Sequence, residues 1–172
     1  MLHFDYSIWG HGWANVMIAD SAARHTNRVT HAAPNDPLRE TLEACIILLD
    51  GADSSAVSYF DEPGEHRFRF VRSGSDIKTS VVWFPDGLGW MPPKEKWVRG
   101  NEGWEDISDE SPYPKSATVF EGTISLPLLC RDVLAAASRI LDTHGVDGYA
   151  QIWNGVFPTE EFTRLSELLR SS

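Results

Sequence analysis

The sequence lacks the common motifs that hold nucleotides, zinc or a catalytic serine. No G-x-G-x-x-G, P-loop or C-x-x-C occurs in its 172 residues, so nucleotide binding and zinc-ribbon chemistry lose their usual support. No G-x-S-x-G elbow occurs either, and Ser73-Gly74-Ser75 is adequately explained as a turn. We therefore expect no cofactor and no catalytic residue, and we lean toward a protein that is not an enzyme.

Cysteines are few, and long apolar runs are missing. Cys45 and Cys130 are the only two cysteines, and both lie in segments with helical spacing, so we expect buried thiols rather than a disulfide. No apolar stretch approaches the ~20 residues that span a bilayer. The first residues, MLHFDYSIWGHGW, contain no basic segment before an apolar run, so we expect no secretory signal and a cytoplasmic location.

Basic residues are also scarce, because 15 Lys and Arg face 25 Asp and Glu, for a formal net charge of -10. Phosphate neutralisation needs clustered Lys and Arg, so this balance argues against nucleic acid as a partner. It would steer a basic protein toward the chain. Solubility alone explains the acidity equally well.

A metal site finds little support among the six histidines. His25 and His31 share one face of an expected strand, but they would lie about 20 Å apart if that strand is extended, which is too far to hold one ion. His11 lies between two glycines, a position that suits a turn as well as a site. We predict no metal.

The clearest structural signal is an antiparallel meander over residues 56–84. Three runs rich in aromatic and β-branched residues are separated by Asp61-Glu62-Pro63-Gly64 and by Ser73-Gly74-Ser75-Asp76. Pro63 and Gly64 suit a type II turn with positive φ at Gly64, and Gly74 suits the second turn. Alternation along 66–72 predicts one apolar face, with Phe68 and Phe70, and one largely solvated face.

Further elements surround this meander on both sides. Residues 2–9 and 13–19 predict a hairpin, and 24–32 predict an edge strand. Asp36-Pro37 begins a helix that Gly51 ends. The chain after the meander predicts a strand over 116–124, a helix that ends at Gly145, an irregular aromatic segment over 146–157 and a last helix from Pro158. We expect one α+β domain over 1–172, a mainly antiparallel sheet of about six to seven strands with about three helices packed on one face.

Residues 85–115 differ in composition from the rest of the chain. Nine prolines and glycines leave no room for a long regular element, so we expect a long loop within the domain, and such connections are usually functional or disordered. Tryptophans and a dense run of acids suggest an acidic, aromatic contact surface, although a merely solvated loop is the commoner case. The partner-binding residues that we predict are Trp90, Trp97, Trp104, Glu105, Asp106 and Asp109.

Four segments carry a resemblance to known proteins: DPLRETLEACIILLDGA (36–52), DEPGEHRFRFVRSG (61–74), VVWF (81–84) and VFPTEEFTRLSELL (156–169). They resemble a family of small uncharacterised bacterial proteins with a DPL helix, an EPGE hairpin and a WF strand. Such proteins are similar in size and acidity to the immunity proteins that accompany bacterial toxins. The resemblance implies a fold and no site, because its motifs are caps and turns.

The function that we expect is therefore non-enzymatic binding in the cytoplasm, of the immunity type, in which a basic toxin domain is covered by an acidic and aromatic surface. The alternative is a small-molecule-binding protein or enzyme in which the 85–115 loop is a lid and His11, His66 and nearby acids line a pocket. A plain structural or oligomer-forming domain is the third possibility. We expect no nucleic-acid or membrane partner, and the sequence leaves the oligomeric state open.

Overall fold

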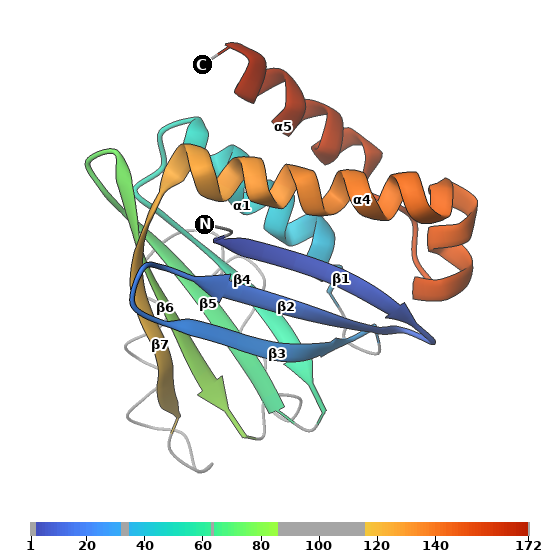
Figure 1. The fold of residues 1–172 in the computed structure, drawn as a ribbon, viewed down its shortest axis with the longest axis horizontal. Coiled ribbons are helices and arrows are strands. Elements are labelled where there is room, and N and C mark those ends of the chain that lie inside the picture. The colour runs from blue at the N-terminus through green and yellow to red at the C-terminus, as the bar shows by residue number, and fades with distance from the viewer. Residues whose placement is uncertain (1–2, 32–34, 63, 86–115, 172) are drawn as a thin grey trace.

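The computed structural model describes residues 3–31, 35–62, 64–85 and 116–171. Within them the chain forms seven strands and three helices, which confirms the predicted α+β class (Figure 1). The elements in chain order are β1 (Phe4–Gly10), β2 (Trp13–Ala19), β3 (Arg24–Thr30), α1 (Pro37–Leu49), β4 (Ser54–Asp61), β5 (Gly64–Ser73), β6 (Asp76–Phe84), β7 (Ala117–Ser125), α4 (Leu126–Trp153) and α5 (Thr159–Ser171).

The strands form two antiparallel sheets, where the sequence had suggested one. The first has the order β1-β2-β3 and the second the order β4-β5-β6-β7. In Figure 1 the three-stranded sheet lies in front of the four-stranded one, and its strands cross those behind it at a steep angle. Strands β3 and β4 pack against each other but belong to different sheets, and helix α1 lies between them in the chain. As predicted, β3 lies at a sheet edge.

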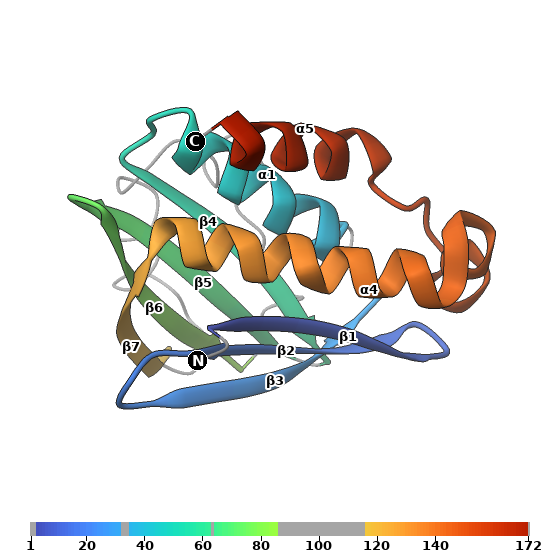
Figure 2. The same ribbon diagram turned by 45° about the horizontal axis from the view of Figure 1, so that its top comes forward.

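The hydrophobic core fills the space that the two sheets and the helices enclose. Figure 2 shows the three helices along one side of the molecule, above both sheets. Tyr6 of β1 meets Tyr59 of β4 at 6.5 Å between ring centroids, and Trp153 of α4 packs edge-on against Tyr6 at 6.2 Å. Each sheet therefore has one face toward this core and one outer face, and the three helices of the described residues lie on the core side.

Helix α1 begins as its sequence predicts. The Asp36 carboxylate accepts a hydrogen bond from the Arg39 backbone N–H at 3.1 Å, and Pro37 occupies the first turn. The apolar stripe buries Leu42 and Cys45 against the core. Cys45 and Cys130 are both buried free thiols, as predicted, and the hydrogen bond to Cys130, together with burial, raises the pKa of the Cys45 thiol well above its usual value.

The meander is confirmed, with one correction to its first turn. Gly74 has φ 68°, as the second turn requires. Gly64, however, does not have positive φ: it is the first residue of β5 and pairs with Asp61. A Cβ at Gly64 would lie 1.9 Å from an atom of the Trp83 ring, so glycine is needed there because an indole lies directly on the backbone.

Helix α4 is longer than the sequence suggested. Gly145 interrupts it with φ 64° and ψ 177°, but helical structure resumes and continues to Trp153, where Asn154 caps it in the left-handed conformation. The segment 146–157 is therefore mostly helical, since burial of Tyr149 and Trp153 against the core stabilises this second portion. Despite these 28 residues, no helix in the described ranges has the length and apolarity needed to cross a membrane.

Candidate functional site

The six residues predicted to bind a partner (Trp90, Trp97, Trp104, Glu105, Asp106 and Asp109) lie outside the described residues. Their segment leaves the four-stranded sheet after Phe84 of β6 and returns at Ala117 of β7. Trp83 pairs directly with Ala117, so the segment leaves and rejoins the sheet at the same end of two adjacent strands, β6 and β7. That end of the sheet also carries the β4–β5 turn, which begins at Asp61.

A stack of aromatic and charged side chains lies on the outer face of the three-stranded sheet. The Trp9 and Trp13 rings lie 6.2 Å apart between centroids with an interplanar angle of 24°. The guanidinium carbon of Arg28 lies 5.4 Å from the Trp13 ring centroid, and an Arg28 Nη2 atom lies 3.2 Å from the Asp61 carboxylate. We call this set the Trp9–Trp13–Arg28 stack. Trp9, 56% exposed, is the most exposed tryptophan of the described residues.

The β1–β2 hairpin, which carries the two indoles, has an unusual backbone. Ile8 pairs with Ala14 and Gly10 pairs with Trp13, so Trp9 is the extra residue of a β-bulge. Gly10, His11 and Gly12 all have positive φ. Trp9 shares the outer face with Asp5 and Ser7 by strand alternation, and Trp13 shares it with Asn15, so the two indoles lie side by side.

The same hairpin is fixed to the rest of the protein through Gly12. Its N–H donates to the Ile152 carbonyl of α4 at 2.9 Å, and its carbonyl accepts from the His31 N–H at 2.8 Å. A Cβ at Gly12 would lie 1.9 Å from the His31 ring. These contacts hold the hairpin against α4, so the indoles are presented on an ordered surface.

A buried ion pair lies on the outer face of the four-stranded sheet. Arg67 donates to Glu65 from both Nε and Nη2, the second bond being 3.0 Å, and Ser58 Oγ donates to Glu65 at 2.6 Å. The Arg67 guanidinium also lies 4.2 Å from the Phe84 ring centroid. Both charged side chains are almost wholly buried. The expectation of a solvated face on β5 is therefore wrong at this end of the strand.

Two histidines meet where the sheets face each other. His25 of β3 and His66 of β5 lie 5.0 Å apart between ring centroids, and His66 lies 4.4 Å from Trp83. Burial, with a smaller effect of His25, lowers the pKa of His66 from 6.5 to about 3. Burial likewise lowers the pKa of His25. Both imidazoles are therefore held neutral, and the described residues contain no group of three or more side chains suited to a metal ion.

His11 and His66, which the alternative function places in one pocket, lie apart in the structure. His11 is exposed at the tip of the β1–β2 hairpin, beside the strand end where Trp13 pairs with Thr30. His66 contacts His25, which pairs with Ile18 toward the other end of that sheet. The two imidazoles therefore lie at different ends of the three-stranded sheet.

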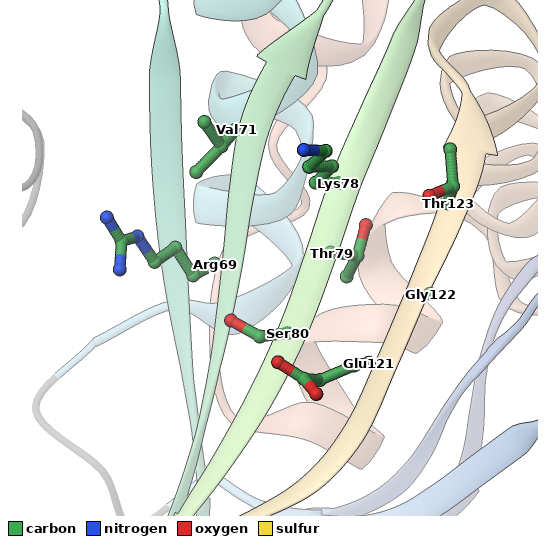
Figure 3. A pocket seen from close by; sticks show the side chains of 8 residues that line it. All are labelled: Arg69, Val71, Lys78, Thr79, Ser80, Glu121, Gly122 and Thr123. Atoms are coloured by element: carbon green, nitrogen blue, oxygen red, sulfur yellow. The ribbon is translucent and has the colours of Figure 1, made fainter.

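A shallow groove of about 510 Å³ crosses the outer face of β5, β6 and β7. Its polar lining includes Arg69, Lys78, Ser80, Glu121 and Thr123 (Figure 3). Figure 3 shows that the Arg69 side chain extends toward the β4 side, away from Glu121. The side chains of Arg69 and Glu121 thus do not point to one place in the groove.

Comparison with family models, with curated proteins and with solved structures finds no match to this chain.

The stack was not recognised from the sequence, although part of its signal is there. Trp9 falls on the polar face of β1, with Asp5 and Ser7, and an aromatic residue on that face is a candidate contact residue. The contribution of Arg28 depends on the pairing of β2 with β3, in which Asn15 lies opposite Arg28. No sequence spacing indicates that pairing.

Proposed function

We propose that this chain is a binding protein of the immunity type, which neutralises a basic partner such as a toxin domain by direct contact. The observation that carries the proposal is the Trp9–Trp13–Arg28 stack on the outer face of the three-stranded sheet, with Trp9 56% exposed. Trp and Arg are the residues most enriched among those that dominate the energy of protein interfaces. Enzymatic activity is not part of this proposal.

Charge supports a basic partner rather than a neutral one. The net charge of -10 would attract a positively charged protein over several ångströms and raise its association rate. In the stack itself, the Arg28 charge is balanced by Asp61 at 3.2 Å. A basic partner would therefore meet indole surface first, with no unbalanced cation of the stack to repel it.

The segment that follows Phe84 remains part of the proposal. Trp90, Trp97, Trp104 and the three acids Glu105, Asp106 and Asp109 would provide a second part of the contact surface. Their segment is attached at the end of the four-stranded sheet near Asp61, and Asp61 is also the last member of the stack. One partner could therefore contact both regions.

The test uses the products of the reading frames that flank the gene, purified and mixed with this chain at roughly physiological salt, where a steered interface still holds in part. A basic product should bind, and its toxicity in the native host should be suppressed by co-expression of the chain. Trp9→Ala should weaken binding about tenfold, whereas Val119→Ala, an exposed apolar residue of β7 (41%), should not. Absence of any retained protein, from these products or from host extract, would refute the immunity function.

The second candidate is a small-molecule-binding function for the groove across β5, β6 and β7. Its volume of about 510 Å³ falls within the usual range for ligand sites. A thermal-shift screen of charged metabolites tests this directly. Stabilisation that is lost in Lys78→Ala and Glu121→Ala, two exposed groove residues, would favour this function over protein binding.

A further inference from the structure

The stack has a layered order that leaves one surface available. Asp61 balances Arg28, Arg28 lies over the Trp13 ring, and the Trp13 ring lies over the Trp9 ring. Trp13 therefore has two neighbours in the stack, Arg28 and Trp9, and Arg28 has two, Trp13 and Asp61. Among the described residues, the only ring that contacts Trp9 is that of Trp13, and more than half of Trp9 is exposed.

The π face of an indole is negatively polarised and attracts cations, most strongly a planar guanidinium that can lie parallel to it. The protein already uses this contact once, between Arg28 and Trp13 at 5.4 Å. A second guanidinium on the outer face of Trp9 would repeat the same contact at the other end of the stack. The two cations would be separated by two indoles, so their repulsion would be small in water.

We propose that the exposed face of Trp9 binds an arginine side chain of a basic protein partner. This inference rests on the proposed function and adds the chemical group that the partner presents. The net charge of -10 favours a cationic occupant over a neutral one or a second copy of this acidic chain. The fixed hairpin lowers the entropic cost of binding, since Gly12 is held to Ile152 and little order is lost.

The neighbourhood of the stack fits such an occupant. Ser7 and Asn15 lie beside each other on the same outer face, one pair of residues along from the indoles, and they supply neutral hydrogen-bonding groups. Asp5 follows in the next row on that face, and its carboxylate bonds Arg139 of α4. An arginine on Trp9 would thus have a polar surface beside it that carries no unbalanced positive charge.

The test compares two short peptides that differ in one side chain. One peptide contains arginine, and the other contains citrulline at the same position, which keeps the shape of the side chain and loses its charge. Binding to the full chain is followed by the indole N–H signal of Trp9 in NMR spectra, assigned with Trp9→Phe. The arginine peptide should bind about two- to fivefold more tightly, the range for an exposed cation–π contact. Trp9→Ala should abolish this preference, and Val119→Ala should keep it.

Three results would overturn the inference. Equal binding of the two peptides would mean that charge has no part in the contact. A preference for arginine that persists in Trp9→Ala would place the cation elsewhere on the acidic surface. Self-association of the chain that disappears in Trp9→Ala would identify a second copy as the occupant.

The same variants separate this inference from the proposed function. A natural partner that binds wild type and Trp9→Ala equally would leave the immunity function intact and refute the role of Trp9. Conversely, a preference for the arginine peptide in a chain that retains no host protein would leave the chemistry of Trp9 intact and refute the immunity function.

Discussion

Acidification should destabilise this protein through His66 before its carboxylates begin to protonate. The imidazole of His66 is only 8% exposed and lies between the His25 and Trp83 rings. Its pKa is lowered from 6.5 to about 3, so the folded protein keeps this ring neutral while the unfolded chain takes up a proton. Its contribution to stability is therefore complete above pH 6.5 and is lost as the pH falls toward 3.

The size of the effect follows from that difference in pKa. Each pH unit below 6.5 lowers the free energy of unfolding by about 1.4 kcal/mol, until the pKa of the folded protein is reached. At a pH of about 5, the loss from His66 alone is about 2 kcal/mol, out of the ~5–15 kcal/mol typical of a folded domain. His25, whose pKa is lowered by burial, should add to the loss.

Urea unfolding, followed by tryptophan fluorescence between about pH 7 and about pH 5, measures this slope. His66→Phe should remove most of it, and His11→Gln, at an exposed histidine, is the matched control. Asp36 acts in the opposite direction, since burial raises its pKa and its protonation stabilises the fold as the pH falls toward 4. The contribution of Asp36 is the same in wild type and in His66→Phe, so it cancels when the two slopes are compared. An equal slope in wild type and His66→Phe would refute the reasoning.

Three further outcomes are expected. Glu65→Gln should lower the free energy of unfolding by about 3–5 kcal/mol in denaturant melts, because it removes the negative charge that faces the buried Arg67 guanidinium, whereas replacing both residues by apolar ones should be much milder. Gly64→Ala should destabilise by about 1–3 kcal/mol and shift the Trp83 fluorescence, since its methyl group would overlap the ring. The two cysteines should resist a thiol reagent in the native protein and react at the rate of unfolding in urea; rapid native labelling would contradict their burial.

Local sequence signals predicted the elements well. Asp36 and Pro37 mark the start of α1 because capping is decided within one turn of chain, and Gly74 marks a hairpin for the same reason. The arrangement of the sheets depends on contacts between distant residues. Whether β3 and β4 share a ladder is decided by how the two sheets pack in three dimensions, and strand alternation carries no information on that point.

The errors in the candidate site have the same origin. The sequence predicts a turn residue with positive φ at Gly64, but the reason for glycine is the Trp83 ring on the neighbouring strand. The β5 face was expected to be solvated because Arg67 alternates onto it, but Glu65 lies two residues earlier on the same face and pairs with it. Residues 86–115, with the predicted tryptophans and acids, lie outside the described residues, so that part of the site stays a prediction.

The pairing of Trp83 with Ala117 has a consequence for how this chain can be altered. Paired residues of antiparallel strands lie only ~5 Å apart, so a turn of a few residues would suffice to join β6 to β7. The register of these two strands is set by their own ladder, from Asp76 and Ser125 onward. Since loop closure depends only weakly on length, the connection can lengthen, shorten or change its sequence without re-registering the sheet. The sequence of this connection can thus diverge while the scaffold stays the same.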